Sequence, residues 1–255
     1  MDSQFNLRDR TVLIAADLSP NIQTLIQNLT LSGADCVLFS EDIKFSEKFA
    51  QVSNEMREVN DKYGRCGAVK AQYQSKQSVH EGIQDAVKIF GGIDAVIDAS
   101  FSSLKVDFFN DATELEAMMG VQLTRSIRLV HETLPFLKTK KKARLIGLGY
   151  EMQLNPQYGD VLGCALRGGL PLFYQTLARE LQSLGLTANW VTMGVTEEYL
   201  LKNEPQSKSV KESLEKLKQK NPEIRLLEPE RLANMILFLL SPAGQGMTGQ
   251  ILNCK

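Results

Sequence analysis

The sequence has few of the residues from which metal sites and disulfide frameworks are built. Its only two histidines, His80 and His131, lie far apart along the 255 residues. Its four cysteines are widely spaced and form no Cys-x-x-Cys pair. Zinc sites and disulfide-rich proteins place such residues at short, regular spacings. We therefore expect no metal site and four reduced thiols.

The sequence also lacks a surplus of charge and any long apolar segment. The formal net charge is −1, which gives no strong attraction to nucleic acid or to an anionic membrane. The longest apolar runs are far shorter than a membrane span. Residues 1–4 lack the basic and apolar regions that begin a signal peptide. We therefore expect a cytoplasmic protein that binds neither nucleic acid nor membrane.

What the sequence does contain is a regular alternation of strand-like and helix-like segments. Apolar runs predict strands at residues 11–15, 36–39, 68–71, 95–97, 144–146, 187–192 and 250–252. Helical apolar stripes lie between these runs. The alternation predicts one α/β domain over residues 1–255, a doubly wound parallel sheet of about seven strands with helices on both faces. Only residues 196–225 lack this periodicity, and we interpret them as an insertion.

The C-terminal third carries two groups of spaced motifs. The first is Ala178-Arg179-Glu180-Leu181, Leu184-Gly185-Leu186, Ala188-Asn189 and Gly194. The second runs through Glu228-Pro229-Glu230, Ser241 and Thr248-Gly249-Gln250. Their order and spacing resemble those of the short-chain dehydrogenase/reductase family, and Gly33-Ala34 and Gly91-Gly92 agree with its N-terminal half. The resemblance implies a Rossmann-like fold, a cleft for NAD(P), and a substrate loop at residues 196–225.

The family binds its cofactor through a glycine-rich loop after the first strand, where this chain has no glycine. The three glycine positions hold Ala16, Pro20 and Ile22. Glycines there let the backbone approach the pyrophosphate and let the helix start close to the sheet. Asp17 adds a negative charge beside the expected phosphates, although we interpret it as a helix cap or a surface-loop residue. We therefore expect that this chain binds no NAD(P).

Further cofactor contacts of the family are replaced as well. The acid that reads a ribose hydroxyl becomes Ser40. The neighbouring Glu41 is interpreted as a solvated loop acid, with substitution for the missing acid as the alternative. The adenine-side aspartate becomes Gln72, and Phe101 stands where the resemblance implies a glycine beside the nicotinamide.

None of the four residues that carry the family's reaction is present. The resemblance places Gly163 at the tyrosine that acts as general acid and base, and Arg167 at the lysine that lowers the pKa of this tyrosine. The serine and asparagine positions hold Tyr150 and Gln122. Arginine stays protonated and cannot relay a proton. We therefore expect no standard catalytic site, and Tyr150 as a substitute proton donor is the one catalytic alternative.

Two long helices are expected at about residues 113–137 and 163–184. In the family, the equivalent helices pair with their counterparts on another subunit. Gly168 and Gly169 lie near the start of the second helix, where glycine lowers helix stability. Either a partner backbone approaches there or the glycines allow close packing within the subunit.

These observations lead to three hypotheses on function. The first is a non-catalytic subunit that pairs with an active short-chain dehydrogenase, which carries the NAD(P), through the two long helices. Such pairs occur in the family, as in the heteromeric dehydrogenase that acts on hydroxybenzylsuccinyl-CoA in anaerobic toluene degradation. The alternatives are a divergent oxidoreductase that uses Tyr150 and a free-standing regulator that senses a metabolite. No residue identifies the substrate.

Overall fold

The centre of the fold is one parallel sheet of seven strands in the order β3-β2-β1-β4-β5-β6-β7. The computed structural model describes residues 5–73, 75–100, 123–150, 161–203, 207, 209–220, 222 and 224–255. The strands are β1 (Thr11–Ala16), β2 (Asp35–Ser40), β3 (Cys66–Lys70), β4 (Ala95–Ala99), β5 (Arg144–Tyr150), β6 (Thr187–Met193) and β7 (Ile251–Cys254). The doubly wound α/β fold expected from the sequence is confirmed.

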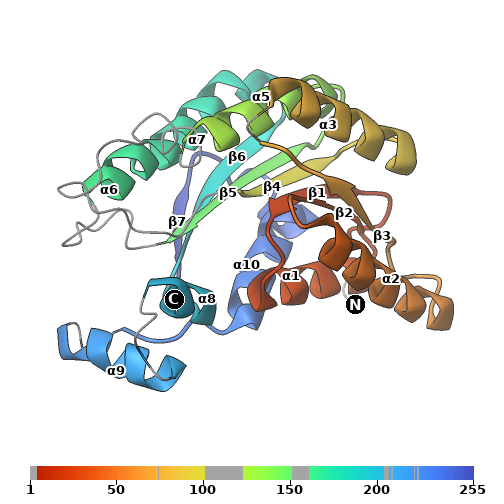
Figure 1. Ribbon diagram of the computed structural model, residues 1–255. Helices are drawn as coiled ribbons and strands as arrows, with labels where there is room; N and C mark the ends of the chain where they lie inside the picture. The colour runs from red at the N-terminus through yellow and green to blue at the C-terminus, as the bar shows by residue number, and fades with distance from the viewer. Residues whose placement is uncertain are drawn as a thin grey trace.

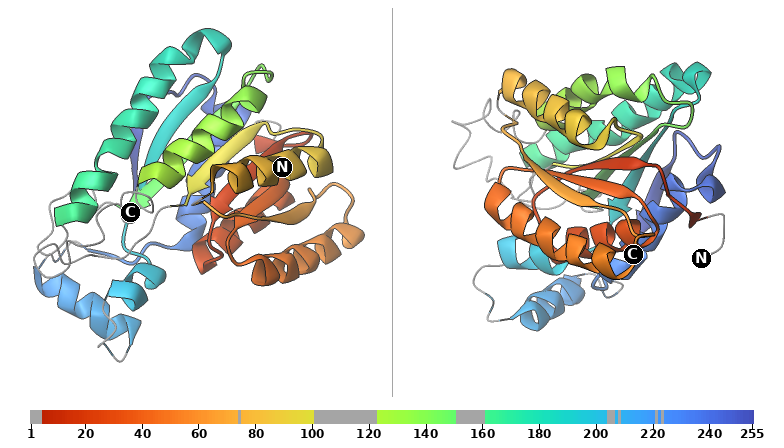
Figure 2. Two further views of the ribbon diagram at one scale, coloured as in Figure 1. Left: turned by 45° about the horizontal axis from the view of Figure 1, so that its top comes forward. Right: turned by 90° about the vertical axis from the view of Figure 1, so that its right-hand side faces the viewer.

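Helices cover both faces of the sheet (Figures 1 and 2). One face carries α1 (Pro20–Leu31), α2 (Ile43–Val59) and α10 (Pro229–Leu240). The other carries α3 (Lys76–Phe90), α5 (Arg125–Leu137), α6 (Val161–Arg167) and α7 (Gly169–Glu180). Short 3-10 helices follow at Gln182–Leu184 and Pro242–Gly244. Every residue of β1, β5 and β6 is buried, which explains why these strands are mainly apolar.

The stretch 196–225, expected as an insertion, lies between β6 and α10 and contains two helices. These are α8 (Glu197–Asn203) and α9 (Val210–Lys220), which follow the C-terminal end of β6 (Figure 1). In the described ranges, no helix is long and apolar enough to cross a membrane.

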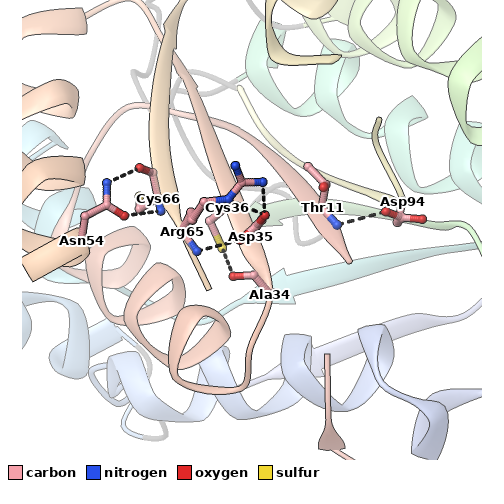
Figure 3. A network of polar contacts seen from close by, with 8 residues as sticks. All are labelled: Thr11, Ala34, Asp35, Cys36, Asn54, Arg65, Cys66 and Asp94. Carbon is pink, nitrogen blue, oxygen red and sulfur yellow. Dashed lines mark hydrogen bonds and ion pairs between the residues drawn. The ribbon is translucent and has the colours of Figure 1, made fainter. Parts of the chain in front are cut away.

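Polar side chains tie together the N-terminal ends of the outer strands (Figure 3). The backbone N–H and Nε of Arg65 donate to the Asp35 carboxylate at 2.7 and 2.9 Å. The Asn54 side chain of α2 pairs with both backbone groups of Cys66, each at 2.8 Å. These contacts stabilise one end of the sheet, and ligands of such folds bind at the opposite, C-terminal end of the strands.

The long helix expected at residues 163–184 is not continuous, so this part of the expectation is wrong. α6 ends at Arg167, Gly168 lies in a turn, and α7 begins at Gly169. Pro171 explains the break, because proline lacks an N–H and its ring clashes with the carbonyl four residues earlier in a helix. Of the helix expected at 113–137, residues 113–122 lie outside the described residues, and α5 forms the remainder.

A buried polar pair links β4 to α7. The Tyr174 hydroxyl donates to Asp98 Oδ2 at 2.9 Å, and the Asp98 side chain is 1% exposed. Gly147 of β5 makes room for this contact. A Cβ at residue 147 would lie 2.5 Å from Trp190 and 2.6 Å from Tyr174, so only glycine fits beneath the two rings.

We expect Gly147→Ala to lower the free energy of unfolding by about 1–3 kcal/mol, because two buried rings must move. The matched control is Gly169→Ala, since a Cβ there meets nothing within 4 Å and alanine favours a helix. Urea denaturation of the three proteins measures the difference. Equal stability of Gly147→Ala and the wild type would contradict this packing.

Candidate functional site

The residues expected at the cofactor loop come together where β1 ends and α1 begins. This position lies at the C-terminal ends of β1 and β4, where the strand order of the sheet reverses. Ser19 is the N-cap of α1, and its Oγ accepts from the Ile22 N–H at 3.5 Å. Pro20 is the first helical residue, which suits proline. Asp17 is therefore not the cap, because Ser19 occupies that position. It is an exposed residue of the loop, which was the other interpretation.

Two of the residues at the three glycine positions pack into the apolar core, and the third, Pro20, is exposed. Ala16 and Ile22 are 2% and 5% exposed and belong to the apolar core on the α1 side of the sheet. The Ile22 side chain lies under the first turn of α1, where the resemblance places a glycine. A branched side chain leaves less room at the helix N-terminus than a glycine would.

Helix α8 closes the remaining part of this cleft. The volume that a water molecule's centre can reach is only about 40 Å³. Glu198 and Lys202 of α8 line it and form an ion pair at 2.7 Å. Pockets for cofactor-sized ligands have volumes on the order of 300–1,000 Å³. The described residues leave less space at this position than such ligands occupy.

Buried aromatic contacts hold α8 in place. Tyr199 and Leu200 of α8 are 5% and 0% exposed. The rings of Tyr199 and Tyr150 lie 5.0 Å apart. Thr196 Oγ1 accepts from the Tyr199 N–H at 3.1 Å and also lies 3.1 Å from the Tyr150 hydroxyl.

Tyr150, the candidate proton donor, is thus part of the packing under α8. Burial raises the pKa of its hydroxyl, the nearby Glu198 raises it further, and the contact with Thr196 opposes this shift only in part. A catalytic tyrosine of this family type needs a lowered pKa. The environment of Tyr150 therefore disfavours proton transfer.

An ion pair lies at the end of the cleft that the resemblance assigns to adenosine. Arg125 of α5 donates to Glu41 at 3.1 Å, and its guanidinium lies 5.1 Å from the centre of the Tyr73 ring. Glu41 is therefore not a solvated loop acid, as the sequence suggested, because Arg125 binds it across the strand ends. Beside this pair is an open hollow of about 360 Å³, lined by Glu41, Lys70, Ala71, Gln72 and Ser75.

Several expected site residues cannot be placed by their side chains. Gln122 and Phe101 lie outside the described residues. Gly163 and Arg167 belong to α6, but the structure does not describe their side chains. That the standard catalytic residues are replaced at these positions is inferred from the sequence alone.

Both histidines of the chain meet at one carboxylate, which the sequence did not reveal. His80 Nδ1 of α3 and His131 Nδ1 of α5 lie 2.9 and 3.1 Å from the Glu132 carboxylate. Glu132 is 8% exposed. Burial raises the pKa of Glu132, but the hydrogen bonds from the two histidines outweigh it, so the pKa is lowered. Among the described residues, no three His, Cys, Asp or Glu side chains are arranged to hold a metal ion.

Comparisons with known proteins agree with the fold. A family model described as enoyl-(acyl carrier protein) reductase matches residues 28–254. The 3-oxoacyl-[acyl-carrier-protein] reductase FabG of Aquifex aeolicus is 23% identical over 198 residues, covering 77% of this chain and 78% of that protein. FabG of Vibrio cholerae is 27% identical over 183 residues, 71% of each chain.

A similar solved structure is the Pseudomonas aeruginosa RhlG/NADP active-site complex. It superposes with a TM-score of 0.85 at 20% identity, covering 99% of this chain and 97% of that chain. At this level of identity, the superposition establishes a shared fold.

The Glu132 cluster generates a test of pH dependence. Because the pKa of Glu132 is lowered in the fold, its stabilisation is complete above its ordinary value of 4.5 and is lost as the pH falls through the folded value. We expect Glu132→Gln to destabilise the protein by about 1 kcal/mol near neutral pH, since the histidines are exposed. The difference between wild type and variant, measured by urea denaturation, should shrink between about pH 5 and 3. A constant difference would contradict this assignment.

Proposed function

This chain belongs to the short-chain dehydrogenase/reductase family, and we propose that within it the chain is a non-catalytic subunit that supports an active, NAD(P)-dependent member. The observation that carries this proposal is the closed cleft. At the position where the family's fold holds a pyrophosphate, α8 and Ile22 leave a free volume of about 40 Å³. Members of this family typically bind NAD(P), and we assign the dinucleotide to the partner subunit.

The residues at the catalytic positions support the same proposal. Gly163 has no hydroxyl to donate, and Arg167 stays protonated. Tyr150 contacts Thr196 and Tyr199. The divergent oxidoreductase, in which Tyr150 donates the proton, is disfavoured by the raised pKa of that residue.

One observation favours the regulator as a second candidate. The open hollow of about 360 Å³ beside Glu41 is within the range of small-molecule sites. A regulator would bind a metabolite there without an associated dehydrogenase. Purification of the chain from its host together with an intact family member would favour the subunit hypothesis instead.

The surface formed by α5 and α7 is the proposed contact with the partner. Leu172 and Ile127 on these helices are 63% and 40% exposed. A Cβ at Gly169 would meet nothing within 4 Å, whereas one at Gly168 would lie 2.6 Å from the Cys164 carbonyl. Packing within the subunit therefore explains why residue 168 is a glycine. Gly169 and Leu172 are the residues that we propose contact a partner. The heteromeric hydroxybenzylsuccinyl-CoA dehydrogenase remains one candidate complex, and no residue of this chain selects its substrate.

We expect the isolated chain to bind neither NAD nor NADP at about millimolar concentration, because the dinucleotide must first displace the buried Tyr199 and Leu200. Calorimetric titration of both nucleotides into the purified protein tests this. Micromolar affinity for either nucleotide would overturn the assignment of the cofactor to a partner.

The partner surface is tested with Leu172→Glu and Gly169→Glu. A charge at a packed helix contact is left without a partner, so we expect either change to weaken the complex by at least about tenfold. Light scattering measures the mass of the chain alone and after co-expression with an intact family member from its host. Ile89→Glu on α3, where the side chain is 57% exposed, is the control and should leave the mass unchanged. Full assembly of both surface variants would place the interface elsewhere.

A further inference from the structure

Helix α2 exposes apolar side chains in a regular row. Phe45 and Val52 are 48% and 54% exposed, and Phe49 between them is half-buried. The three residues follow one another at steps of four and three along the helix. Met56 and Val59 continue the same spacing in the sequence. We call Phe45, Phe49 and Val52 the α2 row.

The rotation of α2 keeps Phe45 and Val52 at the surface, while Phe49 between them packs in part against the core. The inward face of the helix consists of small residues, Ser46, Ala50 and Ser53, which are 0%, 6% and 7% exposed. Next to them, Asn54 forms its two hydrogen bonds with the backbone of Cys66 (Figure 3). Turning the row inward would break these bonds and drive aromatic rings into space that fits serine and alanine. The exposure of Phe45 and Val52 is therefore built into the fold.

The spacing of the row indicates a helix as its occupant. Apolar residues at alternating steps of four and three form the seam along which two helices pack side by side. Isolated exposed apolar residues are common on protein surfaces and show no such order. At the outer edge of the molecule, α2 lies beneath β3, the edge strand (Figure 1), so a second helix can reach it.

The flanking charges identify that helix as α2 of a second copy. Lys48 and Glu55 flank the row on its outer side, and both are exposed. Neither forms an ion pair with another described residue. In an antiparallel pair with its two-fold axis between Phe49 and Val52, Lys48 of each copy lies next to Glu55 of the other. The sequence of α2 is thus complementary to itself.

We infer that α2 binds α2 of a second copy of this chain in antiparallel orientation, with the α2 rows packed together and two Lys48–Glu55 pairs at the sides. This contact is separate from the α5–α7 surface and does not rest on the proposed function. Because the row is short, the contact joins existing assemblies at high concentration rather than forming an obligate dimer.

Sedimentation over a concentration series tests the inference, in both the wild type and a Leu172→Glu background that disables the α5–α7 surface. Phe45→Ser with Val52→Ser should weaken self-association at least about tenfold in both backgrounds. Ile89→Ser, an exposed apolar side chain on α3, is the matched control and should have no effect. The substituted side chains are exposed, so we expect each variant to keep its fold. Thermal denaturation of each variant checks this.

Exchanging the charges of Lys48 and Glu55 distinguishes self-association through α2 from binding to a different partner. Lys48→Glu alone should weaken self-association, because it places like charges together, and adding Glu55→Lys should restore it. Restoration by the double exchange supports the antiparallel pair of identical helices. Failure to restore, unchanged association of the Phe45→Ser, Val52→Ser variant, or a wild type that shows no concentration-dependent mass in the Leu172→Glu background would each overturn the inference.

Discussion

The burial of Tyr199 and Leu200, two residues of α8, is the contact on which the shape of the cleft depends. These side chains are almost fully inaccessible to solvent, and burying each contributes on the order of 1.5–3 kcal/mol. Together they hold α8 over the strand ends and bring Tyr150 into contact with Thr196. The volume left beside these residues is about 40 Å³, and Tyr150 is part of the packing under α8.

A second set of contacts stabilises the same arrangement from the other end. Arg125 of α5 binds Glu41 after β2, so a charge pair spans the region beside the closed cleft. A ligand that extended along these strand ends would have to compete with both contacts, which is why we propose that the dinucleotide belongs to a partner.

Local patterns in the sequence were sufficient to predict the strands and their parallel arrangement. Apolar runs such as 11–15 and 187–192 predict the elements because doubly covered strands are apolar throughout. The break at Gly168 was missed because periodicity alone was considered and Pro171 was not. The pairs Arg125–Glu41 and His80–Glu132 join residues far apart in the chain, so no local signal reveals them. Asp17 and Ser19 are both good capping residues, and only the position where α1 begins selects Ser19.

The account rests on α8 remaining in the cleft when a dinucleotide is offered. A crystal structure of the chain grown with saturating NADPH is the most direct measurement of this. We predict that α8 stays packed on Tyr150, with Tyr199 and Leu200 buried and no dinucleotide at the end of β1. A structure in which α8 has moved aside and the pyrophosphate lies against residues 17–22 would contradict the account.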